Sequence, residues 1–278
     1  MTPLAEDGDV DAKAMRRLAE TQLEVGVDGR VVGGDGAARH PAAGSRRPGG
    51  RRGRRRRDPR AGTHRVVATA RAVLAAGADA VVVAAPFCIA PDDAEIVEHY
   101  RVVAAAVDAP LVAYDYPAGT GARLSPAVVE AIAGNIVALK DSSGDLTTFH
   151  ETRRRVPDLP VLTGSELLAD TSLQLGAAGL VPGLGNVDLD GHVRLYRAAR
   201  EGRWADAAAE QDRLARLFRI VDVGDRSRIG FTAGALGVFK AAMVLRGVIP
   251  DGRVNPPMLP LAADEIACIA AILSLAGL

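Results

Sequence analysis

Cysteine, lysine, aromatic residues and long apolar runs are all scarce in this chain of 278 residues. Its two cysteines, Cys88 and Cys268, lie far apart and lack the spacing of metal ligands, so neither a disulfide framework nor a metal site is expected. No apolar run approaches the roughly 20 residues that cross a bilayer, and the polar, acidic residues 1–11 do not resemble a secretory signal. These absences predict a cytoplasmic protein without a membrane partner.

The formal net charge of zero hides an uneven distribution of charge. Residues 39–60 hold ten arginines and one aspartate, so the rest of the chain is acidic. This segment has no interleaved aromatic side chains on which bases could stack, and we therefore expect no nucleic-acid partner. It is either a basic binding patch, a disordered insertion or the product of a shifted reading frame. We favour the shifted frame, because misframed codons of a GC-rich gene yield Arg, Gly, Pro and Ala.

From residue 61 onward, short apolar runs alternate with amphipathic segments of helical period. This alternation is typical of βαβ units that build a parallel sheet covered by helices. The strands are predicted at 79–84, 110–114, 136–140, 160–163 and 179–182. Helices are predicted at 63–76, 92–107, 125–133, 146–156 and 166–175, and then without intervening strands at 192–201, 204–221, 230–245 and 263–276.

The pattern favours a (β/α)8 TIM barrel, an α/β fold, over a Rossmann domain, since no strand is followed by a Gly-x-Gly-x-x-Gly turn. A sixth strand is predicted at 26–33. The barrel's first and third strands are missing or garbled, because they would fall before residue 4 and within 34–60, where no apolar run occurs. We expect a barrel domain over 1–225, with 34–60 as an anomalous or disordered segment, and a C-terminal helical extension over 226–278.

Lys140 stands at the end of the apolar run 135–139, which reads as a buried strand. The chain has only three lysines (Lys13, Lys140 and Lys240) against 31 arginines. A lysine at a strand end is partly desolvated, which favours the neutral amine that attacks a carbonyl to form a Schiff base. Taken alone, this run favours a Lys140 that merely extends from the strand end into solvent, so the neighbouring elements must decide.

Tyr114 ends the preceding strand at a matching depth. In barrel enzymes the reacting groups lie at the carboxyl ends of the strands, so the two side chains are predicted to be neighbours. A tyrosine hydroxyl beside a Schiff-base lysine is a suitable proton shuttle. The pair therefore indicates catalysis, although neither residue does so alone.

These segments resemble the dihydrodipicolinate synthase / N-acetylneuraminate lyase (DapA) family of pyruvate-dependent class I aldolases. Residues 114–121, YDYPAGTG, are similar to the family's Tyr-Asn-x-Pro-x-x-Thr-Gly pattern, with Asp115 in place of Asn. Residues 136–145, IVALKDSSGD, resemble the family's Schiff-base strand, and 164–166 and 179–186 fit its next two strand ends. The resemblance covers about residues 61–278 and 2–34.

The resemblance implies that Lys140 condenses with the keto group of pyruvate or another 2-oxo acid, while Tyr114 relays the proton. The resulting enamine then adds to an aldehyde or imine substrate, or the reverse cleavage occurs. It implies no metal or organic cofactor, and a homodimer or homotetramer. The residues expected to bind substrate are Gly34, Thr120, Gly164, Ser165 and Gly183.

Besides Asp115, one segment and two single positions depart from the family pattern. The family's Gly-Thr-Thr-Gly-Glu segment, which holds the pyruvate carboxylate, is GGDGAA at 33–38, where hydroxyls are absent and Asp35 would repel a carboxylate. Gly119 stands where the synthases carry an arginine for a dicarboxylate substrate, and Cys88 where they carry a second tyrosine. These differences favour a 2-keto-3-deoxy sugar acid aldolase over strict dihydrodipicolinate synthesis. The remaining alternative is a catalytically impaired member of the family with a misframed segment.

Overall fold

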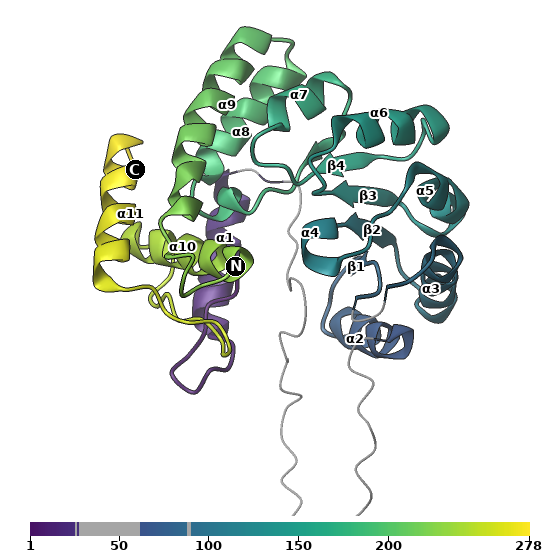
Figure 1. Ribbon diagram of the computed structural model, residues 1–278, viewed down its shortest axis with the longest axis horizontal. Coiled ribbons are helices and arrows are strands. Elements are labelled where there is room, and N and C mark those ends of the chain that lie inside the picture. The colour runs from purple at the N-terminus through teal and green to yellow at the C-terminus, as the bar shows by residue number, and fades with distance from the viewer. Residues whose placement is uncertain (26, 28–61, 88–89) are drawn as a thin grey trace, which may run out of the picture.

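A parallel β-sheet lies at the centre of the computed structural model, which describes residues 1–25, 27, 62–87 and 90–278 (Figure 1). Its strands follow one another in chain order: β1 (Val81–Ala84), β2 (Leu111–Asp115), β3 (Ala138–Asp141), β4 (Val161–Thr163) and β5 (Gly179–Leu180). The five strands predicted after residue 61 are thereby confirmed. β3 extends one residue beyond Lys140, to Asp141.

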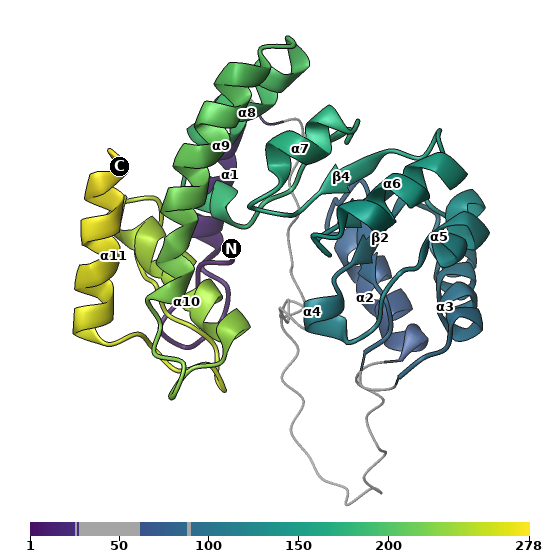
Figure 2. The same cartoon turned by 45° about the horizontal axis from the view of Figure 1, so that its top comes forward.

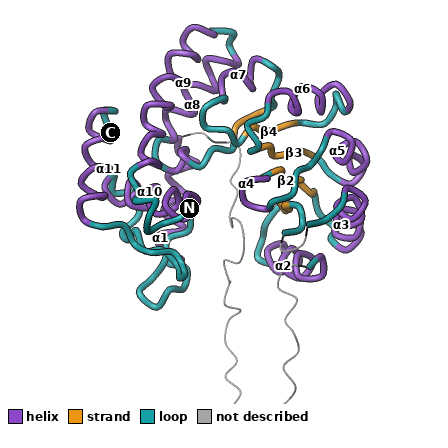
Figure 3. The backbone as a smooth tube through the Cα atoms, viewed as in Figure 1, coloured by secondary structure: helices purple, strands orange, loops and turns teal. Residues whose placement is uncertain are grey.

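Helices connect the strands and cover the outer side of the sheet (Figure 3). Those that precede or connect strands are α2 (Thr63–Ala75), α3 (Asp93–Ala106), α4 (Pro117–Thr120), α5 (Pro126–Ile132), η1 (Ala133–Asn135), α6 (Leu146–Arg155) and α7 (Ala169–Gln174). After β5 come η2 (Leu184–Asn186), α8 (Leu189–Arg200), α9 (Trp204–Phe218), η3 (Arg219–Asp222), α10 (Phe231–Leu245) and α11 (Ala263–Leu275).

The strand order distinguishes a barrel from a doubly wound sheet. Each strand pairs in parallel with the next along the chain, whereas a doubly wound sheet reverses direction at a switch point. The amino-terminal helix α1 (Ala12–Val25) packs against α8, which follows the last strand (Figure 2). The first helix of the chain therefore lies beside the helix that follows the last described strand, as helices of neighbouring units do in a barrel.

Short-range signals in the sequence fix several helix ends. The Asp92 carboxylate accepts the Ala94 N–H and forms a capping box with Glu95 at the start of α3. Ser125 caps α5, whose first residue is Pro126, and Asp145 caps α6. These features explain why the predicted helices agree with the observed ones to within a few residues.

Helix α1 was not predicted, although its start is marked by a cap. The Asp11 carboxylate accepts the N–H of Ala14, and Ala14 and Leu18 are buried one turn apart.

The predicted start of the helix at 166 was wrong by three residues, because α7 begins at Ala169. The Glu166 carboxylate accepts N–H groups from a different loop, so Glu166 lies outside the helix.

Two predictions fall on residues outside the described part of the chain. They are the strand at 26–33, of which only residue 27 is described and is not in a strand, and the arginine-rich segment 34–60. Residues 1–11 contribute one isolated antiparallel bridge, between Leu4 and Val10, and no strand of the parallel sheet. Within the described ranges, every helix is too short or too polar to cross a membrane. The domain boundary at 225 stays a prediction.

The core beneath the sheet contains a buried hydrogen bond from Tyr100 of α3 to β1. The ring of Tyr100 is fully buried and its hydroxyl donates to the Val83 carbonyl at 2.8 Å. Burial raises the pKa of the Tyr100 phenol, which therefore stays protonated and remains a donor. This contact ties α3 to the first described strand.

Replacing Tyr100 by Phe is expected to lower the free energy of unfolding by about 1–2 kcal/mol, because a buried carbonyl loses its donor. Tyr196→Phe is the matched control, since the Tyr196 hydroxyl reaches the Ala178 carbonyl at 3.4 Å in an exposed position. Urea denaturation followed by circular dichroism measures both. Equal losses in the free energy of unfolding for the two substitutions would show that the buried Tyr100 hydrogen bond stabilises the protein no more than the exposed Tyr196 hydrogen bond does.

Candidate active site

The parallel register of the sheet places Tyr114 beside Lys140. On β2 and β3 these two residues are direct partners, and Ala84 of β1 and Leu162 of β4 continue the same row on either side. Side chains in register on parallel strands point to the same face of the sheet. The prediction that Tyr114 and Lys140 lie at the same depth is therefore confirmed by the geometry.

Lys140 lies against the aromatic face of Tyr114. Its Nζ is 4.0 Å from the centroid of the Tyr114 ring, and both side chains are half-buried. A second aromatic ring, that of Tyr116, stacks parallel to Tyr114 with a centroid distance of 5.5 Å and an interplanar angle of 3°. The amine thus faces a wall of two tyrosines at the carboxyl edge of the sheet, where a carbonyl compound would meet both a nucleophile and a phenol.

Gly164 forms the side of the site next to Lys140. A Cβ atom added to Gly164 would lie 2.1 Å from Ser142 Oγ and 3.3 Å from Lys140 Cε. Only glycine fits there without moving Ser142, so the backbone of Gly164 approaches the lysine stem closely. The Gly164 N–H donates to the Asp141 carbonyl at 2.7 Å, which fixes the two strand ends relative to each other.

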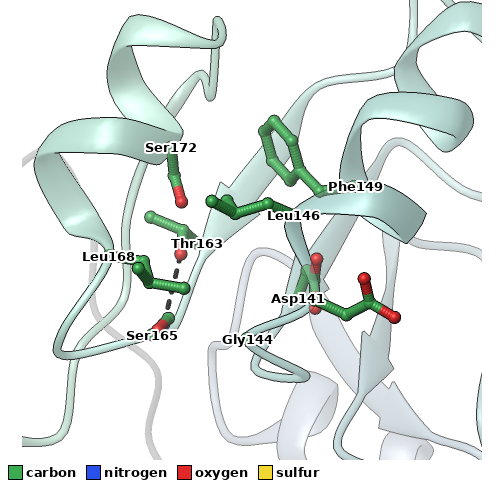
Figure 4. A pocket seen from close by; sticks show the side chains of 9 residues that line it. Asp141, Gly144, Leu146, Phe149, Thr163, Ser165, Leu168 and Ser172 are labelled. Atoms are coloured by element: carbon green, nitrogen blue, oxygen red, sulfur yellow. Dashed lines mark hydrogen bonds between the residues drawn. The ribbon is translucent and has the colours of Figure 1, made fainter.

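Ser165 lines a small cavity on the side of the sheet opposite to the Lys140 side chain (Figure 4). Its N–H donates to Thr163 Oγ1 at 3.2 Å. The cavity lies between the ends of β3 and β4 and helices α6 and α7, and its lining consists of Asp141, Gly144, Asp145, Leu146, Phe149, Thr163, Ser165, Leu168 and Ser172. Because alternate residues of a strand face opposite sides, Asp141 lines this cavity while Lys140 does not.

Thr120 and Gly119 lie in the loop after β2. The Thr120 hydroxyl contacts the carbonyls of Tyr116 at 3.0 Å and Ala122 at 2.8 Å, so it stabilises its own loop. A Cβ added to Gly119 would lie 2.1 Å from Cε1 of the Tyr116 ring. The Tyr116 ring therefore occupies the place where a side chain at position 119 would begin.

Gly183, on the loop after β5, donates its N–H to Glu166 Oε1 at 2.6 Å. Gly34 and Cys88 lie outside the described residues. The structure thus brings together Lys140, Tyr114 and Gly164. The substrate-binding roles of Thr120, Ser165, Gly183 and Gly34 stay predictions.

Sequence reasoning missed Tyr116, whose ring extends the wall formed by Tyr114. The available signal was its position two residues after Tyr114, since residues two apart in extended backbone share a face. It also missed the acidic residue Glu166 as a partner of the loop after β5. No local sequence pattern indicates that contact, because it joins residues 17 and 18 positions apart through a turn of the fold.

Two buried carboxylates, Asp115 and Asp141, lie one position beyond the Tyr114–Lys140 pair and are also register partners. Asp115 Oδ1 accepts the Leu124 N–H at 3.0 Å and Asp141 Oδ1 accepts the Ser143 N–H at 2.8 Å. Burial raises the pKa of Asp115 to about 6, and the charge of Asp141 adds to the rise, against the lowering effect of the Leu124 N–H. Each carboxylate holds the loop that follows a candidate catalytic residue.

The Asp115→Asn variant is expected to be more stable than the wild type at pH 7.5, with little difference at pH 4. The folded pKa of about 6 lies above the ordinary value of 3.8, so the folded state loses stability as the pH rises through this interval. The asparagine keeps an acceptor for Leu124 and carries no charge, and the gain is about 2–3 kcal/mol.

Urea unfolding at both pH values measures this difference, with the exposed Asp158→Asn as the control. A gain for Asp115→Asn that is the same at pH 4 and pH 7.5 would show that Asp115 does not titrate in this interval.

Metal ligands do not cluster in the part of the chain that the structure describes. Across residues 1–25, 27, 62–87 and 90–278, no three His, Cys, Asp or Glu side chains are grouped so that they could hold a metal ion.

Comparison with solved structures agrees with the barrel. YagE, a prophage protein of E. coli K12 belonging to the dihydrodipicolinic acid synthase family and solved in complex with pyruvate, superposes with a TM-score of 0.82 at 23% identity. The match covers 100% of this chain and 96% of that one. The fold is therefore the predicted (β/α)8 barrel class.

Comparison of sequences gives the family. An uncharacterized DapA-like lyase of Halobacterium salinarum is 36% identical over 218 residues, which are 78% of this chain and 68% of that protein. The 4-hydroxy-tetrahydrodipicolinate synthase of Kineococcus radiotolerans is 30% identical over 306 residues, covering 100% of this chain and 91% of that protein. Residues 61–276 match the Dihydrodipicolinate synthetase family. The predicted family and the predicted class of enzyme, a lyase like dihydrodipicolinate synthase, are confirmed, and the chain belongs to the dihydrodipicolinate synthetase family.

Proposed function

We propose that this chain is a Schiff-base-forming lyase or synthase that acts on pyruvate or another 2-oxo acid, with Lys140 as the nucleophile and Tyr114 as the proton relay. The observation that carries this proposal is the position of Lys140 Nζ, 4.0 Å from the centre of the Tyr114 ring at the carboxyl edge of a parallel sheet. The pyruvate complex of YagE supports the choice of a 2-oxo acid.

The reaction begins when the neutral amine of Lys140 attacks the keto carbon. A C–N bond forms, the carbonyl oxygen takes up a proton, and loss of water leaves an iminium ion. Removal of a proton from the neighbouring carbon gives an enamine. The enamine carbon attacks the aldehyde or imine carbon of the second substrate, a C–C bond forms, and water releases the product from the lysine.

Tyr114 is suited to the proton transfers because its ring contacts the amine that reacts. The phenol donates a proton to the departing oxygen and recovers one from the attacking group, so the same side chain acts as acid and base in turn. The stacking of Tyr116 on the Tyr114 ring restricts the rotation of that ring. The absence of a side chain at Gly164 leaves room for the Lys140 stem, since a Cβ there would lie 3.3 Å from Lys140 Cε.

Cleavage of 2-keto-3-deoxy sugar acids is the favoured alternative to dihydrodipicolinate-type condensation. Gly119 carries no side chain, and the Tyr116 ring fills the space beside it. A cationic side chain for a second carboxylate is therefore absent from position 119, and a hydroxylated substrate fits a phenol better than a dicarboxylate does. Screening aldehydes with the unreduced wild-type enzyme and pyruvate, and identifying the products, distinguishes the two reactions.

The oligomeric state and the cellular compartment that we propose for the enzyme are those expected of its family. We expect a homodimer or homotetramer that works in the cytoplasm on small-molecule substrates. A catalytically impaired chain with a misframed segment is the alternative, and it concerns residues 34–60, outside the described part. Resequencing the gene across codons 30–62 decides the question of the reading frame.

Incubation with pyruvate and borohydride is expected to increase the intact mass of the wild-type protein by one reduced pyruvyl group, and not that of Lys140→Ala. Lys13→Ala is the control, because Lys13 is an exposed lysine that the reagent meets equally well. An adduct that persists in Lys140→Ala would assign the Schiff base to another lysine. No adduct on well-folded wild-type protein would refute the proposed function.

Tyr114→Phe is expected to retain the borohydride adduct while slowing its formation about 100-fold or more, the contribution of a positioned acid–base group. The ring keeps its stacking on Tyr116, and only the hydroxyl is lost. The rate is measured by quenching the trapping reaction at successive times and determining the fraction of protein that carries the adduct. Tyr196→Phe is the control for loss of a hydroxyl away from the site. Unchanged kinetics in Tyr114→Phe would remove Tyr114 from the proton relay.

A further inference from the structure

A row of buried polar side chains lies where the sheet packs against helices α6 and α7. Asp115 pairs in register with Asp141, and Asp141 pairs with Thr163, so the three lie side by side at the strand ends. Ser172 of α7 lines the same small cavity as Asp141 and Thr163. The four residues are between 2% and 7% exposed. Polar groups buried this deeply are expected to have hydrogen-bond partners.

Three oxygen atoms in the lining of the cavity lack a full set of partners among the described residues. Asp141 Oδ1 accepts the Ser143 N–H, whereas Oδ2 accepts no donor. Thr163 Oγ1 accepts the Ser165 N–H at 3.2 Å, which leaves the hydrogen of the Thr163 hydroxyl without an acceptor. The Ser172 hydroxyl neither donates nor accepts a hydrogen bond within the described part of the chain.

These three oxygens are open to the cavity. The fully enclosed side-chain atoms without a partner in the described ranges are His99 Nε2 and Glu166 Oε2, so the three oxygens each retain access for a water-sized sphere. The cavity offers the centre of such a sphere a volume of about 10 Å³, which is about the room that one water molecule needs. Figure 4 shows the Ser172 hydroxyl pointing toward Thr163.

The charges around the cavity favour a neutral occupant. The Asp141 carboxylate would repel an anion. Helix α6 begins at Leu146, which is part of the lining, and the positive amino-terminal end of this helix disfavours a cation. The Asp145 carboxylate already accepts the Thr147 N–H and bonds Arg123. Apolar side chains make up much of the remaining lining: Leu146, Phe149 and Leu168.

We propose that this cavity binds one water molecule, which donates a hydrogen to Asp141 Oδ2 and accepts hydrogens from the Thr163 and Ser172 hydroxyls. Three hydrogen bonds are the usual number for a buried water molecule. The carboxylate, which can only accept, thereby gains a donor, and each hydroxyl gains an acceptor. This water site goes beyond the proposed function and does not depend on it.

The bound water joins three elements of the fold. Asp141 ends β3, Thr163 ends β4 and Ser172 lies in α7. The Asp141 carbonyl also accepts the Gly164 N–H, and a Cβ at Gly164 would lie 3.3 Å from Lys140 Cε. The water therefore fastens α7 to the strand ends that hold Gly164 beside the stem of Lys140.

Crystallography of the full chain tests the site directly. We expect one peak of electron density within about 2.5–3.0 Å of Asp141 Oδ2, Thr163 Oγ1 and Ser172 Oγ, with the height of other buried waters. The absence of a peak from a well-ordered cavity would overturn the proposal. Crystals grown in a thallium(I) salt, which stands in for potassium, identify an ion: an anomalous signal at the peak would also overturn it.

Oxygen-17 magnetic relaxation dispersion, which counts the water molecules held inside a protein, tests the site in solution. Ser172→Val is expected to lower the count by one, because the branched apolar side chain fills the cavity and removes one hydrogen-bonding group. Ser274→Val is the matched control, since it makes the same change at an exposed position of helix α11. Equal counts in the wild type and Ser172→Val would contradict the proposal.

Ser172→Ala provides the same test with a smaller disturbance, should the valine variant not fold. Alanine leaves the space open and removes only the hydroxyl, so the water keeps two of its three hydrogen bonds. Its residence time is expected to shorten about fivefold, the effect of one ordinary hydrogen bond, and to stay the same in Ser274→Ala. An unchanged residence time in Ser172→Ala would refute the assigned contact between Ser172 and the water.

Discussion

The lateral register of the parallel strands is the constraint on which the candidate site depends. Tyr114 faces Lys140 because β2 and β3 are aligned at this pair, and no loop geometry is needed to bring them together. A shift of one residue in either strand would turn one of the two side chains to the opposite face. The apolar residues that bury these strands therefore also determine which polar groups meet at their ends.

Three carboxylates near the Tyr114–Lys140 pair order the loops at the carboxyl edge of the sheet. Asp115, Asp141 and Glu166 each accept backbone N–H groups from a loop at the carboxyl edge of the sheet. Loops at this edge carry many N–H groups that lack strand partners, and a carboxylate can accept several of them. The arrangement orders the loops, but it places negative charge in a region of low solvent exposure. The raised pKa of Asp115 is one result of that placement.

The sequence was sufficient for those parts of the protein that depend on local patterns. Apolar runs located the strands and helical periodicity located the helices, three of which the structure shows to be capped by Asp92, Ser125 and Asp145. The Tyr114–Lys140 pair was also accessible, because strand ends in consecutive βα units have a defined relation. Contacts through space were not accessible: Glu166 was assigned to a helix, since nothing nearby in the sequence shows that its carboxylate reaches Gly183.

The contact between Gly119 and Tyr116 has a consequence for the way substrate specificity can change in this protein. The Tyr116 ring lies where the first side-chain carbon of residue 119 would be, so the two positions cannot vary independently. An arginine introduced at 119 alone would collide with the ring and disturb its stacking on Tyr114 before it could meet any substrate. A change of specificity that requires an arginine at position 119 must therefore alter position 116 first, or both positions together. The order in which the two substitutions arise is thus constrained by the packing of the Tyr116 ring.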